Sequence, residues 1–406
     1  MALYDARPPF AAIGGTMPPE FAALPTPCYL LDEAALTRNA EILGSLSRRT
    51  GCRVLLAQKA FSNYDLYPLL APHLAGTEAS GLFEARLGAE EMPGKEVHAF
   101  CAAYRADEMN ELLRYADHIV FNSPAQLAKF GPAAKAAGKS VGLRINPECS
   151  TQDGHAIYDP CAPGSRLGTT RAQWDAAVAA NPALPQLLDG LHFHTLCEQD
   201  ADALAVTLDA VAEKFGDLLP KIKWLNFGGG HHITRPGYDM ATLEHCIRRA
   251  QHDWGVTVYL EPGEACALNG GYLLTRVLDV VQNGDTTIAI LDASAACHMP
   301  DVIEMPYRPP LLGAGEPGEK PCVVRLAGPT CLAGDVIGDY GFDAVPEVGD
   351  LLVFGDMAIY TTCKNNTFNG MPLPGIYARK PDGTAREIVT FGYSDFKYRL
   401  GQKEKK

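Results

Sequence analysis

The chain has 406 residues, of which 47% are hydrophobic and 20% are charged, enough for two domains with a large core. No apolar run approaches the ~20 residues that cross a bilayer, and the N-terminus lacks the basic-then-apolar layout of a signal peptide, so we expect a cytoplasmic protein with no membrane partner. The net charge of −13 argues against a nucleic-acid partner and is compatible with a cationic substrate. Twelve cysteines without any Cys-x-x-Cys pair favour reduced thiols over a disulfide framework or a zinc knot.

The first 26 or so residues are rich in Pro and Ala and have no clear period, which predicts an arm lying on another domain. A strand is expected at 26–32 and an amphipathic helix at 33–47. From there apolar β runs alternate with helical stretches. The predicted strands are 54–60, 76–80, 97–102, 118–122, 140–146, 190–195, 224–230 and 256–263. The predicted helices between them are 83–91, 106–115, 124–137, 171–180, 201–215 and 240–254.

Strands that alternate with helices in this way indicate an α/β chain with a (β/α)₈ barrel. A doubly wound open sheet is the alternative, but it would normally carry a glycine-rich turn after its first strand. This chain has Gln-Lys-Ala-Phe at 58–61 in that place. After about Asn269 the runs become strand-like, at 272–282, 286–292, 321–327, 351–354 and 386–391. We predict a barrel domain over 33–268 and a mostly β domain formed by 1–32 and 269–406, with a frayed tail at 401–406.

Lys59 ends the first predicted barrel strand and is followed at once by a polar turn. In a (β/α)₈ barrel the carboxyl ends of the strands surround the active site. A partly desolvated amine loses its proton and becomes a nucleophile that forms Schiff bases. A strand-end lysine can also extend into solvent or close an ion pair, so Lys59 needs further support.

Three other groups end predicted strands on the same rim: His194, the glycines Gly228, Gly229 and Gly230, and Glu261. The glycine triplet lets backbone N–H groups approach an anion, as phosphate sites of this fold do. Each group has an ordinary alternative, namely a half-buried histidine, a tight turn and an exposed turn acid. Together with Lys59 they describe a pocket for pyridoxal 5′-phosphate, with the carboxylate keeping the pyridine nitrogen protonated and the imidazole against the ring.

A metal site is the rival interpretation of this rim, with His192, His194, His231 and His232 as ligands. Such a site would also need carboxylate ligands at other strand ends, and Glu261 is the only clear one. We therefore expect no metal.

In the second domain, Cys331 lies in a Gly/Pro turn and Asp335 follows four residues later. The pair could be a proton donor and a carboxylate for a cationic substrate, or a plain turn with a buried thiol. Tyr360 could bring a phenol to a phosphate oxygen, or could simply end a strand.

At these residues the chain resembles the alanine-racemase-fold, or fold-type III, pyridoxal-phosphate-dependent decarboxylases of basic amino acids, over nearly its whole length. Within them it is most similar to the carboxynorspermidine (carboxyspermidine) decarboxylases. The motifs that carry the resemblance are Leu-Ala-Gln-Lys-Ala-Phe at 56–61, Gly-Leu-His-Phe-His-Thr at 190–195 with Cys197 and Glu198, Asn-Phe-Gly-Gly-Gly-His-His at 226–232, Leu-Glu-Pro-Gly-Glu at 260–264 and Met-Ala-Ile-Tyr-Thr-Thr at 357–362.

The resemblance implies that Lys59 is the Schiff-base lysine, that His194 stacks on the cofactor ring and that Glu261 pairs with the pyridine nitrogen. It implies further cofactor contacts from Gly228, Gly229, Gly230, Gly263 and Tyr360. Cys331 would be the general acid and Asp335 a substrate carboxylate, both reaching the site from the partner subunit of a homodimer. Further substrate-binding candidates are Asp292, His298, Asp301 and Glu304.

Two departures from the family bear on the substrate. Many relatives carry Arg after Glu-Pro-Gly where this chain has Glu264, which disfavours diaminopimelate and suits a polyamine tail without a distal carboxylate. Ornithine-type enzymes carry an acid directly after the cysteine, where this chain has Leu332. The expected reaction is decarboxylation of carboxynorspermidine or carboxyspermidine to norspermidine or spermidine, with Arg144 and Glu198 as further pocket candidates.

Three alternatives stay open. The chain could decarboxylate another basic amino acid of the diaminopimelate, ornithine or arginine type. It could be a racemase of the same fold, although racemases are expected to pair the pyridine nitrogen with Arg and to use a tyrosine base. It could also be a non-catalytic pyridoxal-phosphate carrier, although such carriers are single barrels.

Overall fold

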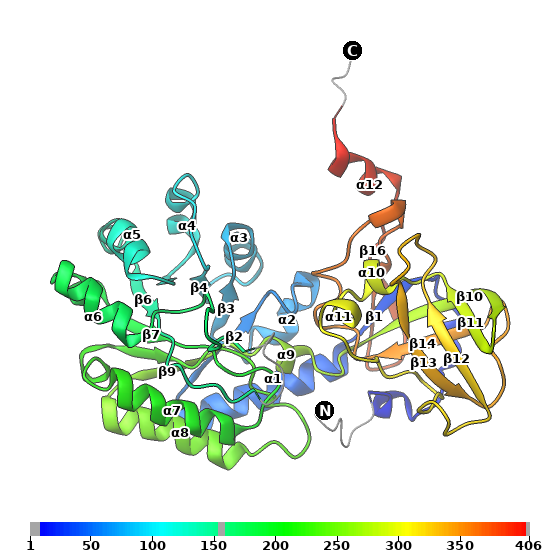
Figure 1. The fold of residues 1–406 in the computed structure, drawn as a ribbon, viewed down its shortest axis with the longest axis horizontal. Coiled ribbons are helices and arrows are strands. Elements are labelled where there is room, and N and C mark those ends of the chain that lie inside the picture. The colour runs from blue at the N-terminus through cyan, green and yellow to red at the C-terminus, as the bar shows by residue number, and fades with distance from the viewer. Residues whose placement is uncertain (1–8, 153–158, 403–406) are drawn as a thin grey trace. The chain divides into compact units, whose positions relative to one another are not determined.

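The computed structural model describes residues 9–152 and 159–402, so the start of the predicted arm and the end of the predicted tail lie outside the described residues. The chain forms two compact units, one of Met1–Thr37 with Ala267–Lys406 and one of Arg38–Cys266 (Figure 1). Within the described ranges, every helix is too short or too polar to cross a bilayer.

Eight parallel strands close into a barrel in the unit Arg38–Cys266, each paired with the next along the chain and the last with the first. The predicted (β/α)₈ barrel is therefore confirmed. Most strands are shorter than predicted because rim residues leave as loops; Gly228 and Gly230, for example, have φ of 69° and 81°. The strands are β2 (Arg53–Ala57), β3 (Gly76–Ala79), β4 (Glu96–Phe100), β5 (His118–Phe121), β6 (Ser140–Arg144), β7 (Gly190–His192), β8 (Trp224–Asn226) and β9 (Thr257–Leu260).

Helices surround this barrel, and several begin and end where the sequence predicts (Figure 1). α6 starts in a capping box, in which Thr170 accepts from the Gln173 N–H and the Gln173 side chain accepts from the Thr170 N–H. α8 starts at the Asp239 cap and ends at Gly255, whose left-handed φ of 69° favours glycine. The helices are α1 (Glu33–Thr50), α2 (Tyr67–Leu70), α3 (Leu82–Glu91), α4 (Met109–Tyr115), α5 (Pro124–Ala136), α6 (Arg171–Ala180), α7 (Ala201–Phe215), α8 (Met240–Trp254) and α9 (Glu264–Ala267).

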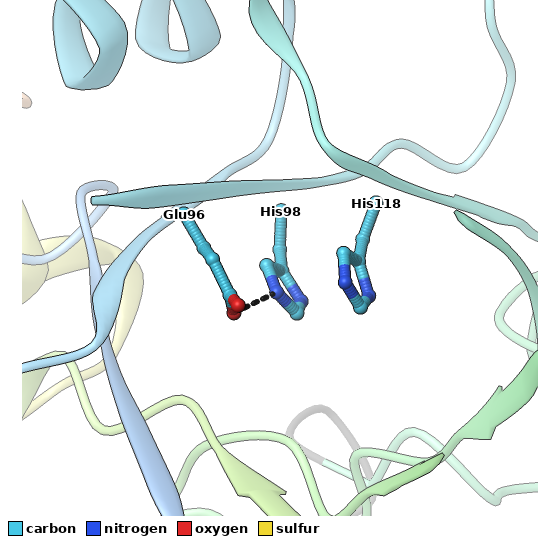
Figure 2. Close-up of side chains that lie close together, drawn as sticks. All are labelled: Glu96, His98 and His118. Atoms are coloured by element: carbon cyan, nitrogen blue, oxygen red, sulfur yellow. Dashed lines mark hydrogen bonds and ion pairs between the residues drawn. The ribbon is translucent and has the colours of Figure 1, made fainter. Parts of the chain in front are cut away.

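Large side chains fill the interior of the barrel. Trp224 lies in a cluster with three further buried residues, Leu55, Val120 and Tyr259. A Cβ on Gly190 would lie 2.0 Å from the Trp224 ring, so only glycine fits there. Beside them His98 and His118, paired in register on β4 and β5, stack with ring centroids 3.9 Å apart (Figure 2). The barrel is thus a packed core, and chemistry is left to its rim.

The other unit is built on one mixed sheet in the order β13-β12-β11-β10-β1-β15-β16, with β14 also paired to β10. β1 runs antiparallel to β10 and parallel to β15, so an N-terminal strand completes the sheet. The elements are β1 (Cys28–Asp32), β10 (Gly271–Asn283), β11 (Thr286–Leu291), β12 (Cys322–Ala327), β13 (Val336–Phe342), β14 (Leu351–Gly355), β15 (Gly375–Arg379), β16 (Ala385–Val389), α10 (Ala295–His298), α11 (Asp301–Glu304) and α12 (Tyr393–Leu400).

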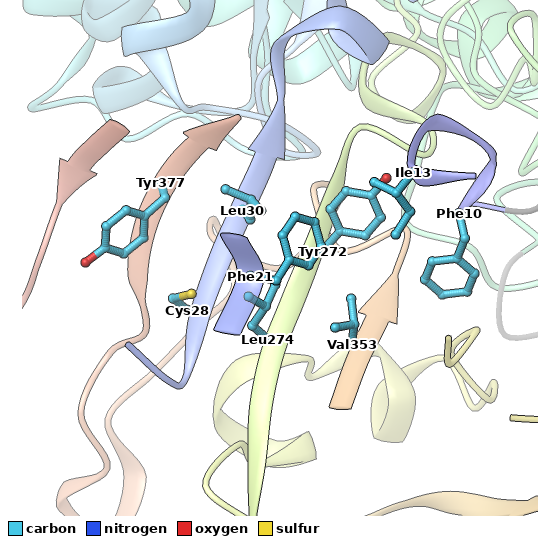
Figure 3. Close-up of a cluster of buried hydrophobic side chains, with 9 residues drawn as sticks. All are labelled: Phe10, Ile13, Phe21, Cys28, Leu30, Tyr272, Leu274, Val353 and Tyr377. Atoms are coloured by element: carbon cyan, nitrogen blue, oxygen red, sulfur yellow. The ribbon is translucent and has the colours of Figure 1, made fainter. Parts of the chain in front are cut away.

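The described part of the N-terminal arm packs on this sheet. Phe10 and Phe21 contact the Tyr272 ring, with centroids 6.3 Å and 5.6 Å away. Together with buried residues of β1, β10, β14 and β15 they form the apolar cluster drawn in Figure 3. This burial of aromatic surface explains why a Pro- and Ala-rich segment without helical or strand period is ordered.

Candidate active site

Lys59 lies in the turn that follows β2, and its ammonium is 3.7 Å from Glu78 Oε2 on the neighbouring strand β3. Glu78 is only 1% exposed. Burial raises the pKa of the Glu78 carboxyl above its usual value, although the Lys59 charge opposes the shift. Sequence reasoning missed Glu78; its signal was an acid inside a short apolar run that ends on the rim.

Glu261 follows β9 directly and is buried at 3% exposure. Its carboxylate accepts from His192 Nε2 at 3.0 Å and from Asn226 Nδ2 at 2.6 Å. Burial alone would raise the pKa of Glu261, but His192 and Lys59 hold it below its usual value. Burial lowers the pKa of His192, so a neutral imidazole donates to an ionised carboxylate. Asn226 opens the motif at 226–232, but the sequence alone assigned it no role.

The three glycines after β8 lie where the loops of three strands meet. A Cβ on Gly228 would be 2.5 Å from Phe193 O, one on Gly229 2.5 Å from Glu261 O, and one on Gly230 2.0 Å from Leu196 O. No side chain fits in these positions, so the triplet holds the loops after β7 and β9 against the loop after β8.

The same triplet fixes the His194 ring. The Gly229 N–H donates to His194 Nδ1 at 3.2 Å, which leaves the ring proton on Nε2. Arg144 donates to the His194 carbonyl at 3.1 Å, and its guanidinium lies 4.7 Å over the Phe100 ring. Burial, Lys59 and Arg144 keep the pKa of His194 well below its usual value, so this imidazole is neutral.

The turns that carry Lys59 and Glu261 also lie side by side. A Cβ on Gly263 would be 2.6 Å from the Ala60 Cβ, and the Ala57 N–H donates to Pro262 O at 3.3 Å. The barrel rim therefore gathers an amine, two buried carboxyl groups, a neutral imidazole and a glycine turn, although the sequence spreads them over 200 positions.

The histidines of the rival metal interpretation have other partners. His192 bonds Glu261, His231 Nε2 lies 3.3 Å from Phe227 O, and His232 Nε2 lies 3.4 Å from Glu264. Within the described ranges, one close group of possible metal ligands exists, Glu96, His98 and His118 (Figure 2). Its two rings are stacked within 15° of parallel, so their in-plane lone pairs cannot converge on one ion. We assign this group to packing.

The other candidate residues lie in the β unit. Cys331 is exposed, and its N–H donates to Asn369 Oδ1 at 2.8 Å. Asp335, at 3% exposure, accepts from Ser294 Oγ at 2.9 Å, from Thr330 Oγ1 at 2.6 Å and from the Ala296 N–H at 3.2 Å. The Asp335 carboxylate thus joins the Cys331 turn to the start of α10.

Asp292 and His298 are bonded within the same unit. Asp292 accepts from Thr26 Oγ1 at 2.6 Å and from Thr275 Oγ1 at 2.5 Å. His298 is fully buried; its Nδ1 accepts from the Ser294 N–H, and its Nε2 lies 3.1 Å from Pro372 O. These contacts fix the loop between β11 and α11.

Four further candidates are placed as follows. Asp301 and Glu304, on α11, both accept from the Lys364 ammonium. Tyr360 is half-buried with a left-handed φ of 50°. Glu198 is exposed on the barrel unit with φ of 51°.

Residues 4–358 match the sequence model of the family described as "Pyridoxal-dependent decarboxylase, C-terminal sheet domain". The chain belongs to this family. It is a pyridoxal-phosphate-dependent carboxy-lyase, and the fold-type III resemblance is confirmed.

Relatives that match over nearly their full length are similar to this chain within that family. The chain is 43% identical to carboxyaminopropylagmatine decarboxylase of Synechocystis, covering 94% of this chain and 97% of the relative. It is 41% identical to carboxynorspermidine/carboxyspermidine decarboxylase of Campylobacter jejuni, covering 93% and 99%. A solved structure of carboxynorspermidine decarboxylase from Campylobacter jejuni, complexed with norspermidine, superposes with a TM-score of 0.83 at 40% identity and covers 93% of this chain and all of that one.

Proposed function

We propose that this enzyme decarboxylates carboxynorspermidine or carboxyspermidine to norspermidine or spermidine in polyamine biosynthesis. The observation that carries the proposal is the full-length likeness, at 40% identity and TM-score 0.83, to a structure that holds norspermidine. The departures at Glu264 and Leu332 support it, because position 264 lacks the Arg expected for diaminopimelate and position 332 lacks the acid expected for ornithine.

The barrel rim fits pyridoxal phosphate. When bound, this cofactor supplies an electron-withdrawing ring that stabilises the charge left at carbon when CO₂ departs. Lys59 would hold it through its amine, Glu261 would keep a proton on the pyridine nitrogen, and His194 would lie against the ring. Phosphate contacts would come from Gly228, Gly229, Gly230, Gly263 and Tyr360. The ionised, buried Glu261 supports this assignment, because a neutral carboxyl could not hold a positive ring nitrogen.

Proton transfers would fall to Glu78 of one chain and to Cys331 of its partner in the dimer. Glu78 has a raised pKa and lies beside Lys59, so it can exchange a proton with that amine. Cys331 would deliver a proton to carbon from its exposed thiol. Asp292, His298 and Asp335 would line the substrate pocket, and their bonds to the chain make that lining rigid. Asp301 and Glu304 would meet a substrate ammonium.

We further propose a cytoplasmic homodimer in which the β domain, 1–32 and 269–406, completes the partner's barrel site. Exposed apolar residues support this proposal: Leu332 follows Cys331 and is 43% exposed, and Phe368, at 44% exposure, precedes the Asn369 that bonds the Cys331 N–H. A second chain is a suitable cover for such a surface. The twelve free thiols support a reducing compartment.

Carboxyaminopropylagmatine is the second candidate substrate, because the Synechocystis relative of that name is 43% identical. This compound differs from the two carboxypolyamines at its distal end, where the agmatine part carries a guanidinium in place of an ammonium. Both substrates place a cation far from the carboxylate that is lost.

A CO₂-release assay tests the proposal. Purified enzyme would be given carboxynorspermidine, carboxyspermidine, carboxyaminopropylagmatine, diaminopimelate, ornithine and arginine. We expect the largest kcat/KM for a carboxypolyamine. Preferred turnover of diaminopimelate, ornithine or arginine would contradict the proposal, as would inversion of a substrate without CO₂ release, which would indicate a racemase.

A further inference from the structure

A lysine in the β unit binds two carboxylates at once. The Lys364 ammonium donates to Asp301 Oδ1 and to Glu304 Oε2. Asp301 and Glu304 are the first and last residues of α11, three positions apart, so both side chains lie on one side of that turn. The three side chains together carry a net charge of −1. The acidic pair is thus an ammonium-binding site filled by the chain's own ammonium.

The segment that carries Lys364 also reaches the proposed proton donor. The Asn366 side chain donates to Ala296 O at 2.8 Å, and its N–H donates to Cys297 O at 3.0 Å. Three residues on, Asn369 accepts from the Cys331 N–H at 2.8 Å. The Lys364 ammonium and the Cys331 turn are therefore held by one short loop. A linear substrate that presents its reacting carbon to Cys331 can extend its cationic tail toward α11.

We infer that Lys364 is a resident competitor for the distal ammonium of a linear polyamine substrate, and this inference rests on the proposed function. The incoming ammonium shares or displaces Lys364 at Asp301 and Glu304, which weakens binding of both the substrate and its cationic product. When the product leaves, Lys364 returns to the two carboxylates. The lysine thereby sets substrate affinity without touching the reacting carbon.

The test removes the Lys364 charge and measures the change in KM. In holoenzyme, Lys364→Met should lower both the KM for carboxynorspermidine and the inhibition constant of norspermidine by about fivefold. This is the change in binding expected when one partly exposed ion pair no longer competes. The kcat should stay unchanged. Lys364→Arg keeps the charge and should behave as the wild type. Glu304→Gln combined with Lys364→Met restores the net −1 and should return KM toward the wild-type value.

Lys320→Met is the matched control, since Lys320 is also partly exposed and bonds Asp343 and Gly313 O in the same unit. Its KM should stay at the wild-type value. A KM in Lys364→Met equal to or above that of the wild type overturns the inference. If the variant also has a lower Tm than the wild type, Lys364 is a structural counter-ion. Absence of CO₂ release from carboxypolyamines by the wild type would instead overturn the proposed function.

Discussion

Glu261 stays ionised although it is almost fully buried, because His192 and Asn226 both donate to it. A carboxylate of this kind is what a protonated pyridine ring needs beside it. The cofactor chemistry therefore depends on two residues that need not touch the cofactor.

Removing the His192 donor should move the pH profile. In the wild type, the Phe100 and His192 rings stack with centroids 5.4 Å apart, and His192→Phe keeps a ring in that place. The variant loses the donor that counteracts the effect of burial on the pKa of Glu261. The pKa of Glu261 should rise, so the acid limb of the kcat/KM profile should shift to higher pH. His192→Gln retains an N–H donor and should shift it less. An acid limb at the wild-type position in His192→Phe would show that another group titrates there.

The sequence alone predicted that Lys59, His194 and Glu261 are neighbours. Each follows a predicted strand, and the carboxyl ends of the parallel strands of a barrel meet on one rim. Glu78 was missed because it stands in no distinctive motif, and Asn226 was given no role because the motif at 226–232 does not show which carboxylate it contacts. Their importance depends on burial and on partners from other strands, which are tertiary properties.

At the scale of elements, the loop after β8 is the contact point between the loops after β7 and β9. Gly229→Ala would place a Cβ 2.5 Å from Glu261 O, so that carbonyl or the glycine loop must move. We expect a loss of roughly 2 kcal/mol in the free energy of unfolding and weaker cofactor binding, measured by denaturant titration and by cofactor dissociation. Gly81→Ala is the control, since a Cβ there meets nothing within 4 Å. Equal stability of the two variants would contradict the steric role of the triplet.

The stacked histidines on β4 and β5 should make stability depend on pH. Burial and the neighbouring His98 lower the pKa of His118 to about 3 in the folded chain, while the unfolded value is about 6.5. Between these values the unfolded state binds the extra proton, so stability is present above about pH 6.5 and is lost as the pH falls toward 3.

His118→Phe removes this proton site and keeps a ring for stacking. Between pH 6 and pH 4 the wild type should lose about 2 kcal/mol more stability than the variant, measured by urea unfolding. Parallel losses in the two proteins would mean that His118 does not titrate in this range.

The missed strands show which elements a sequence hides. β13 contains Gly338, Asp339 and Gly341, which resemble turn residues, and β15 follows directly on Pro374. Both become strands through pairing, β13 with β12 and β15 with β1 and β16. The barrel strands, by contrast, are short apolar runs spaced by helices, and the sequence alone predicted them.

At the scale of the whole molecule, the proposed homodimer would bring Cys331 of one chain to the site that Lys59 of its partner forms. If the partner supplies Cys331, mixing inactive Lys59→Ala and Cys331→Ala proteins should restore activity, because a heterodimer then has one intact site. We expect up to about a quarter of wild-type activity after subunit exchange. Lack of recovery in mixed dimers, verified by tagged co-purification, would place both residues of a site in one chain.

The account depends most on Lys59 as the residue that holds pyridoxal phosphate. The direct measurement is the visible absorption spectrum of purified wild type and Lys59→Ala. The account predicts a visible band in the wild type, its loss from the variant and no CO₂ release by the variant. An unchanged band in Lys59→Ala would contradict it.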